Sequence, residues 1–297
     1  MELPSPLTSR PLTPAESTAV FEVMAAQEKH DLGEVHIEEA DIVGDWQRPS
    51  FDVSASTIGV YDGDRLVGYA EVTDADRGDA AVDPAYRGRG IGTALAQWMQ
   101  ERARAGGSTV IGQPVPAGSP SDVLLRALGY RERWTAWVLE LPAGREVPAR
   151  PLPDGYSIRE AGEADHRAAY TVVEDAFLEW SERERASFED FSATVFERPG
   201  FEPWHLRLAL DPDGEVVGTA VLSISEGCAS VSHLAVRPDQ RNRGLAQALL
   251  ADAFAQGRAH GAPRSELATD TRTGALSLYE KVGMEPTSTW VNLAIDL

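Results

Sequence analysis

Cysteine and long apolar runs are scarce in this chain of 297 residues, and each scarcity excludes a class of protein. The single cysteine, Cys228, cannot build a disulfide framework or a cysteine-based structural zinc site. No apolar run approaches the ~18 residues that a membrane span requires. The first 14 residues also lack the basic start and apolar core of a signal peptide. We therefore expect a cytoplasmic protein in a reducing compartment.

Basic side chains are also in the minority, because 27 lysines and arginines stand against 47 aspartates and glutamates, giving a formal net charge of −20. Nucleic-acid binding requires clustered lysine and arginine, and anionic membrane surfaces repel acidic proteins. We therefore expect neither a nucleic-acid partner nor a membrane partner. Hydrophobic residues make up 42% of the chain, which is typical of globular proteins. The length is about twice that of a ~150-residue domain and so predicts two domains.

An internal repeat accounts for this length. Residues 81–92, AVDPAYRGRGIG, match residues 235–246, AVRPDQRNRGLA, at an offset of 154 residues. The offset continues without a gap to Gly129 and Gly283, and 13 of the 50 pairs from residue 81 to residue 130 are identical. Unrelated helices would not keep one frame through a second glycine, so the chain contains two copies of one domain.

Both copies show the same succession of expected elements. A helical pattern, at residues 14–27 and again at 163–180, precedes a β-hairpin at 57–70 and again at 206–220. Each copy ends in a strand-like stretch, at residues 134–141 and 290–297, and a proline-rich segment typical of a stiff linker lies between the copies. We predict an N-terminal domain at residues 1–141, a linker at 142–154 and a C-terminal domain at 155–297, each of the α+β class.

The repeated motif predicts a binding site for an anion. In the second copy, a strand candidate at residues 230–236 is followed by Pro238, which blocks further ladder pairing. A helix with an apolar face begins near Leu245. The tight turn between them would direct free backbone N–H groups and the positive end of the helix dipole at a ligand such as a pyrophosphate. A tight turn without any ligand is the plainer alternative for a single motif of this kind.

This motif resembles the acetyl-CoA signature of the GNAT superfamily of N-acyltransferases, Arg-x-x-Gly-x-Gly/Ala after a strand that ends in Val-x-Pro. Residues 278–284, LYEKVGM, resemble the second landmark of that family, Leu-Tyr-x-x-x-Gly-Phe, at the spacing of the family. The layout of two such domains is similar to that of mycothiol synthases and other tandem GNAT enzymes. The resemblance implies a mixed, mostly antiparallel sheet flanked by helices in each domain, with acetyl-CoA as the cosubstrate.

The resemblance also implies a cofactor-binding set and a general acid in the C-terminal copy. The strand would splay from its neighbour, and the backbones of Leu234, Ala235 and Val236 would hold the pantetheine and the acetyl carbonyl. Tyr279 would protonate the departing thiolate, as a phenol of pKa ~10 can, although a purely structural core role is the alternative. The pyrophosphate would lie on Arg241, Asn242, Arg243, Gly244, Leu245 and Ala246.

The base that deprotonates the amine is not fixed by the sequence. His233, with a suitable intrinsic pKa of ~6.5, and Glu226 are candidates, while a structural histidine and a water chain are the alternatives. Arg272 stands where the family often has an asparagine, seven residues before the tyrosine. We expect no metal site, because the histidines and acidic residues at 30–41 lack a recognised ligand spacing.

The N-terminal copy keeps the turn motif but lacks the acid. Leu125 corresponds to Tyr279 in the repeat and cannot donate a proton. We expect this copy to be non-catalytic, to remain able to hold CoA, and to support the C-terminal copy. Its corresponding cofactor-binding residues are Ala81, Val82, Arg87, Gly88, Arg89, Gly90, Ile91 and Gly92.

Acidic and aromatic side chains at residues 174–190 would border the acceptor groove in the layout of the family. They could bind a cationic amine, or they could form a solvated helix face. The sequence predicts an N-acetyltransferase that acts on the primary amine of a small molecule or peptide by direct attack in a ternary complex, as a monomer or homodimer. The alternatives are a non-catalytic acyl-CoA-binding sensor or partner-binding protein, a mycothiol synthase-like enzyme and an aminoglycoside-type acetyltransferase. Ser230 and Ser232 stand where a mycothiol synthase would be expected to have a glutamate.

Overall fold

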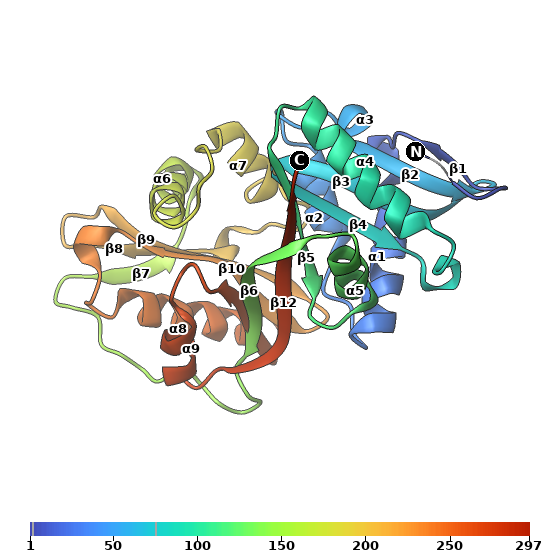
Figure 1. The fold of residues 1–297 in the computed structure, drawn as a ribbon. Coiled ribbons are helices and arrows are strands. Elements are labelled where there is room, and N and C mark those ends of the chain that lie inside the picture. The colour runs from blue at the N-terminus through green and yellow to red at the C-terminus, as the bar shows by residue number, and fades with distance from the viewer. Residues whose placement is uncertain (2, 75) are drawn as a thin grey trace. The chain divides into compact units, whose positions relative to one another are not determined.

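The structure is a computed structural model that describes residues 1, 3–74 and 76–297, and the chain divides into two compact units (Figure 1). The first unit contains residues Met1–Thr135 and Thr289–Leu297, and the second contains Ala136–Ser288. Each unit has one mixed sheet with helices on both faces, so the predicted α+β class is confirmed. No helix within the described residues is both long enough and apolar enough to span a membrane.

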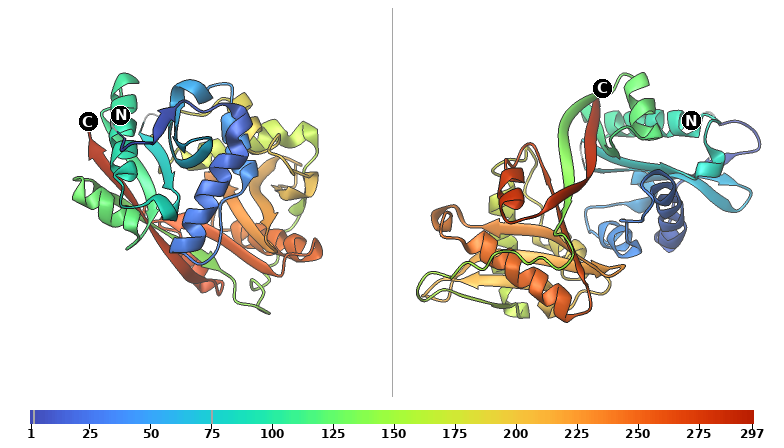
Figure 2. Two further views of the ribbon diagram at one scale, coloured as in Figure 1. Left: turned by 90° about the vertical axis from the view of Figure 1, so that its right-hand side faces the viewer. Right: turned by 90° about the horizontal axis from the view of Figure 1, so that it is seen from below.

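The first unit has the strand order β1-β2-β3-β4-β5-β12, in which β4 and β5 are parallel and the other neighbours are antiparallel. Helices α1 and α4 lie on opposite faces of its sheet, drawn in blue and blue-green in Figure 2. The strands are β1 (Thr8–Arg10), β2 (Thr57–Asp62), β3 (Arg65–Asp74), β4 (Arg77–Val82), β5 (Val110–Pro116) and the later part of β12 (Glu285–Asp296). The helices are α1 (Ser17–Asp31), α2 (Glu39–Trp46), α3 (Val53–Ser56), α4 (Ile91–Ala105) and α5 (Pro120–Ala127).

The second unit has the strand order β6-β11-β10-β9-β8-β7, in which only the β10–β11 pair is parallel within the described residues. Helices α6 and α8 cover opposite faces of its sheet (Figure 1). The strands are β6 (Arg131–Glu140, in this unit from Ala136), β7 (Ser157–Glu160), β8 (Leu206–Leu210), β9 (Val216–Ser225), β10 (Cys228–Val236) and β11 (Arg264–Asp270). The helices are α6 (His166–Phe177), α7 (Phe188–Thr194), α8 (Leu245–Ala259) and α9 (Leu276–Lys281).

The last strand of each sequence repeat belongs to the sheet of the other unit. In the second unit, β6 pairs with β11 from Ala136–Asp270 to Glu140–Glu266. In the first unit, β12 pairs with β5 from Trp290–Pro116 to Asp296–Val110. The predicted boundaries, 1–141 and 155–297, follow the repeat along the chain, whereas the compact units differ from them by this exchange of strands. Residue patterns reveal a strand and its buried face, but the partner of that strand depends on long-range pairing.

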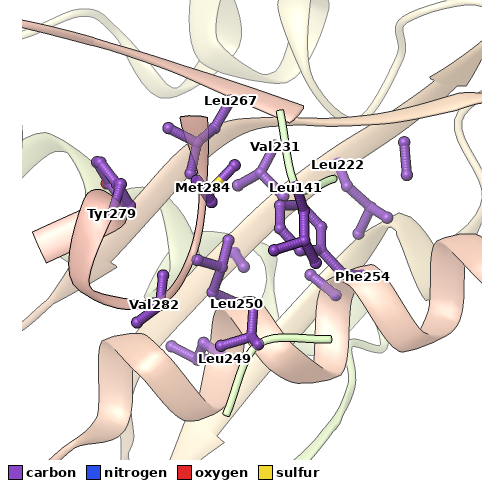
Figure 3. Close-up of a cluster of buried hydrophobic side chains, with 14 of the residues drawn as sticks. Leu141, Leu222, Val231, Leu249, Leu250, Phe254, Leu267, Tyr279, Val282 and Met284 are labelled. Atoms are coloured by element: carbon purple, nitrogen blue, oxygen red, sulfur yellow. The ribbon is translucent and has the colours of Figure 1, made fainter. Parts of the chain in front are cut away.

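The core of the second unit forms where α8 packs on the sheet. Leu249 and Phe254 are fully buried there, in a cluster that also includes Leu267 and Val282 (Figure 3). Burial of each such side chain stabilises the fold by about 1.5–3 kcal/mol. Gly218 of β9 permits this close approach, because a Cβ at that position would lie 3.0 Å from Leu249 Cδ1. Helix α8 is thereby fixed to the sheet, and its first turn is held at the end of β10.

Candidate active site

Strands β10 and β11 separate partway along their length. In the described chain, their parallel ladder runs from Cys228–Arg264 to Val231–Leu267 and goes no further. Beyond that point β10 stays paired with β9 as far as Val236, and β11 stays paired with β6. The ladder between β10 and β9 shifts register between Val231 and His233, and such a bulge bends a strand. The separation leaves backbone groups of β10 facing β11 without a strand partner.

A cavity of about 800 Å³ lies at this separation and extends along the first turn of α8. Residues of both strands line it, such as Leu234 of β10 and Ala268 of β11. Three of the residues named from the sequence do not line it: His233, Glu226 and Arg243. The residues that do are Leu234, Ala235, Val236, Arg241, Asn242, Gly244, Leu245, Ala246 and Tyr279.

The turn before α8 leaves its backbone N–H groups open. Asn242 (φ 64°) and Gly244 (φ 84°) adopt the left-handed conformation, which glycine and asparagine tolerate best. No acceptor among the described residues takes a hydrogen bond from the N–H groups of residues 242–246, and the first helical bond runs from Ala248 N to Gly244 O at 3.0 Å. These groups and the positive end of the helix dipole favour an anion such as a diphosphate at this position.

The guanidinium of Arg241 is engaged by other groups of the protein. Its guanidinium forms a bidentate ion pair with Glu179 at 2.7 and 2.6 Å, and its Nε donates to the carbonyl of Val236 at 3.2 Å. The corresponding Arg87 of the first unit is held in the same way by Asp31, with both bonds at 2.7 Å. The pair ties the segment after helix α6 to the turn, and Arg241 lines the cavity while its charge is balanced by Glu179.

Tyr279 of α9 belongs both to the core and to the wall of the cavity. It is 9% exposed and lies at the margin of the cluster formed by Leu267, Val282 and Met284 (Figure 3). Burial raises the pKa of its phenol to about 12, so the proton is retained at neutral pH. Among the described residues, no protein group makes a hydrogen bond with the Tyr279 hydroxyl. The structure thus keeps available a phenol that could act as a proton donor.

His233 lies among aromatic rings and not on the cavity wall. Its ring centroid is 5.3 Å from that of Phe177 and 5.9 Å from that of Phe191, and Nδ1 is 3.0 Å from Ser232 Oγ. Burial lowers the pKa of the imidazole to about 4, with a smaller opposing effect from Glu174. The ring is neutral at pH 7, but a group with this pKa is a weak base.

Glu226 does not line the cavity, so the structure argues against it as the base that deprotonates the amine. It occupies the exposed turn between β9 and β10, with φ 48°. Val236, which lines the cavity, is at the other end of β10. A strand rises about 3.3 Å per residue, so the length of β10 separates the carboxylate from the reacting position.

Three of the acidic side chains at residues 174–190 are paired with arginines. Glu174 is 2% exposed and accepts two bonds from Arg183, at 2.6 and 2.9 Å. Asp175 is paired with Arg185, and Glu179 with Arg241 as described above. Glu179, the acidic residue of this segment that lines the cavity, is therefore not an unpaired negative charge for a cationic acceptor.

Aromatic and polar side chains line the part of the cavity near the end of helix α6. The ring centroids of Phe177 and Trp180 are 5.1 Å apart, and both residues line the wall. Arg272, which the sequence marked only as a departure from the family, stacks over Trp180 at 4.8 Å and donates from Nη2 to Asp270 at 2.5 Å. Asp270 is 8% exposed, and its carboxylate also accepts from the Arg272 N–H at 2.8 Å. Arg272 does not line the cavity itself, but it contacts Trp180 and Asp270, which do.

The linker contributes a cavity residue that the sequence did not indicate. Arg150 lines the wall next to Gly244. A basic residue in a proline-rich segment carries no local signal of this position, which results from packing of the linker on α8.

The first unit has a smaller cleft at the matching place, with a volume of about 330 Å³. Strands β4 and β5 are paired only at Arg77–Gly112 within the described residues, so they also separate. The turn again has left-handed residues, at Gly88 (φ 74°) and Gly90 (φ 84°). Arg89 is not on the wall of this cleft, but the other predicted residues are: Ala81, Val82, Arg87, Gly88, Gly90, Ile91 and Gly92.

Two glutamine side chains close the separated strands of the first unit. Gln27 Oε1 accepts a hydrogen bond from Val82 N–H at 3.0 Å, and Gln113 Nε2 donates to the carbonyl of Ala80 at 3.2 Å. Leu124 packs against the helix start, since its Cδ2 lies 2.8 Å from where a Cβ on Gly92 would be. The backbone groups that correspond to Leu234 and Val236 are thus satisfied by the protein itself.

Side chains that could ligate a metal ion do not cluster within residues 1, 3–74 and 76–297. No group of three or more histidine, cysteine, aspartate and glutamate side chains there could hold a metal ion.

Comparison with known proteins points to one family across both halves of the chain. The family model described as Acetyltransferase (GNAT) family matches residues 21–116 and 167–284. The mycothiol acetyltransferase of Salinispora tropica is 33% identical over 241 residues, which cover 76% of this chain and 77% of that protein. The mycothiol acetyltransferase of Thermobispora bispora is 30% identical over 236 residues, covering 75% and 78%.

Solved structures share the fold over nearly the whole chain. A GCN5-related N-acetyltransferase from Sphaerobacter thermophilus superposes with a TM-score of 0.75 at 28% identity and covers 99% of this chain and 97% of that one. A tandem GNAT protein from the clavulanic acid biosynthesis pathway has a TM-score of 0.71 at 20% identity, with 98% of both chains covered. The likeness to the second protein shows the fold alone.

Proposed function

The chain belongs to the GNAT family of acetyltransferases, and from this premise we propose that it transfers the acetyl group of acetyl-CoA to the primary amine of a small molecule or peptide. The observation that carries the proposal is the cavity of the second unit, where the separated strands, the open turn and Tyr279 meet. The diphosphate would bind the N–H groups of residues 242–246. The pantetheine would lie along Leu234, Ala235 and Val236.

The reaction is a direct attack within a ternary complex. The amine nitrogen attacks the thioester carbon, so that the C–N bond forms and the C–S bond breaks. Backbone N–H groups of β10 that face the separation can polarise the carbonyl oxygen as charge develops on it. Tyr279 donates its proton to the departing sulfur. Burial keeps the phenol protonated at neutral pH, and the same loss of solvent disfavours a free thiolate beside it, so that the departing sulfur is stabilised by taking up the proton.

The amine proton leaves through water in the cavity in this proposal. His233 lies outside the cavity and has a pKa of about 4, which makes it a poor base. Asp270 lines the cavity, but its carboxylate is committed to Arg272. An acceptor that enters as the neutral amine needs no protein base before attack.

The acceptor class is indicated by the relatives and by the wall of the cavity. Relatives about one-third identical carry the name mycothiol acetyltransferase, so a mycothiol-related amine is the first acceptor to test. Phe177 and Trp180 offer apolar surface, and Ser232 and Thr269 offer hydroxyl groups, to a polar small molecule. The first unit is non-catalytic in this proposal, because Leu125 replaces the tyrosine and the glutamines close its strands.

The test compares release of the CoA thiol with and without a panel of amines that includes a mycothiol-related acceptor. We expect turnover by the wild type, and a Tyr279→Phe variant whose kcat is lower by about 100-fold, because positioned proton transfer typically contributes 10²–10⁴-fold. Tyr130→Phe is the matched control, since this tyrosine is 3% exposed in the first unit and should leave kcat unchanged.

Full turnover by Tyr279→Phe would contradict the assigned acid. Binding of acetyl-CoA by the wild type without turnover of any amine would favour the non-catalytic sensor instead.

A further inference from the structure

The linker between the sequence repeats is fastened along helix α8. Glu146 is paired with Arg258 at 3.4 Å near the end of the helix, and the carbonyl of Pro148 accepts from Gln247 Nε2 at 2.8 Å near its start. Between these contacts, Val147 is 6% exposed within the core cluster. The linker therefore runs from the C-terminal end of α8 toward its N-terminal end, and its path is fixed by side chains and not by proline stiffness alone.

Arg150 follows where this path reaches the start of α8. A Cβ built on Gly244 would lie 2.4 Å from Arg150 Nε and 2.5 Å from its Cδ, so the side chain lies directly on that glycine. Gly244 is the left-handed residue immediately before the helix and belongs to the open turn. Both residues line the cavity. The guanidinium is thus held beside the same N–H groups that would receive a diphosphate.

The charge of Arg150 is not balanced within the described part of the chain. No hydrogen bond or ion pair joins it to another described residue, whereas Arg241 is paired with Glu179 and Arg243 donates to the Tyr156 hydroxyl at 3.3 Å. A cation at the positive end of a 15-residue helix is unfavourable unless an anion lies between the two. The guanidinium of Arg150 and the N-terminal end of α8 therefore both place positive potential at the open turn.

We propose that Arg150 binds the diphosphate of acyl-CoA and completes the phosphate site beside the helix N–H groups. This inference rests on the proposed function and adds to it a binding residue that lies outside the turn motif. A guanidinium suits the position because it can donate two parallel hydrogen bonds to phosphate oxygens. Arg150 lies beside the turn that would hold the diphosphate and has no assigned role in acetyl transfer. We therefore expect it to contribute to cofactor affinity and not to the chemical step.

The experiment measures the Kd of acetyl-CoA by titration calorimetry for the full chain and for Arg150→Met. We expect the Kd to rise about 10-fold, as for loss of a hydrogen bond to a charged group, and the difference to shrink as salt is added. The kcat at saturating acetyl-CoA should stay unchanged. Arg150→Lys should restore part of the affinity. Because Arg150 is exposed, its replacement should not change the unfolding temperature.

Two controls separate the possible outcomes. Arg145→Met removes another exposed linker arginine, which lies 3.8 Å from Glu285, and should not alter the Kd. S-acetylpantetheine lacks the diphosphate, so wild type and Arg150→Met should use it equally well. An unchanged Kd for acetyl-CoA in Arg150→Met, or an equal loss with S-acetylpantetheine, would overturn the role of Arg150 alone. Failure of the wild type to bind acetyl-CoA would overturn the proposed function together with it.

Discussion

Glu71 of β3 is a buried carboxyl with acidic neighbours. It is 5% exposed, and its Oε2 accepts a hydrogen bond from the Trp46 indole at 2.9 Å. Burial, followed by the charge of Asp79, raises the pKa of Glu71 to about 8. Burial also raises the pKa of Asp79 and of Asp45. At neutral pH the Glu71 carboxyl therefore retains a proton in the folded first unit, while it is ionised in the unfolded chain.

Glu71 should make the first unit less stable in mild base. The pKa of Glu71 in the folded state, about 8, lies above the ordinary value of 4.5. The contribution of the protonated carboxyl to the stability of the folded state is therefore complete below pH 4.5 and is lost as the pH rises through 8. Glu71→Gln keeps an acceptor for Trp46 and removes the titration. Urea unfolding should show the variant more stable than wild type at pH 8.5, by roughly 1–3 kcal/mol, with a smaller difference at pH 4.5.

The exposed Glu101 of α4 provides the matched control for this measurement. Glu101→Gln should follow the wild-type pH dependence. If Glu71→Gln also follows it, the carboxyl is already ionised at neutral pH and the buried-acid interpretation is wrong.

Single residues show what local sequence can and cannot reveal about the site. The turn at residues 241–246 and Tyr279 were found from the sequence because each belongs to a short motif with fixed spacing. The pairing of Arg241 with Glu179 joins residues 62 positions apart, and the contact of Arg150 with Gly244 depends on the path of the linker. Neither contact has a local pattern, so only the fold reveals them.

At the level of elements, the two separated strand pairs have the same construction but different access. In the second unit the separation opens into a cavity of about 800 Å³, while in the first unit the cleft has about 330 Å³ and Gln27 and Gln113 bind the strand groups. A pantetheine arm entering the first unit would have to replace both hydrogen bonds, each worth about 1 kcal/mol. We therefore expect one acetyl-CoA per chain.

The equivalent glycines Gly90 and Gly244, both with φ 84°, offer a matched pair of variants for this expectation. Either glycine replaced by valine suffers similar backbone strain, because the left-handed conformation costs about 1–2 kcal/mol. Gly244→Val should abolish acetyl-CoA binding in calorimetry, whereas Gly90→Val should keep both the wild-type Kd and a stoichiometry near one. A wild-type stoichiometry of two that Gly90→Val reduces to one would show that the first unit also binds the cofactor.

The predicted elements were most reliable where the residue pattern is local. The hairpins at 57–70 and 206–220 are confirmed as β2–β3 and β8–β9, because turn residues separate two largely buried apolar runs in each hairpin. The helical patterns at 14–27 and 163–180 correspond to α1 and α6. The short edge strands β1 and β7, of 3 and 4 residues, were not predicted, since they are too brief and too exposed to show alternation.

For the whole molecule, the exchange of last strands predicts that a destabilising substitution in the last strand of one sequence repeat destabilises the compact unit formed mainly by the other repeat. Leu139 of β6 and Leu293 of β12 are equivalent in the repeat, and both are 0% exposed. Leu139 packs in the core of the second unit, and Leu293 packs with Leu125 and Tyr130 in the first. Each leucine replaced by alanine should destabilise the protein by about 2–5 kcal/mol.

Hydrogen exchange followed by mass spectrometry would locate each effect. Leu293→Ala should accelerate exchange mainly in β5 and α5, and Leu139→Ala mainly in β11 and α8. The reverse assignment would favour contiguous domains at residues 1–141 and 155–297. The sequence indicated two domains through the repeat, but the repeat contains no information about which sheet accepts each last strand.

The position of β12 has a consequence for how the protein is made. Residues 289–297 leave the ribosome only after the entire second unit, yet β5 of the first unit has no partner on that side until they arrive. Domains commonly fold one after another during translation, starting from the N-terminus. Here the sheet of the first unit stays incomplete at β5 until residues 289–297 have been synthesised. For the same reason, neither half of the gene could be lost without leaving the surviving half one strand short.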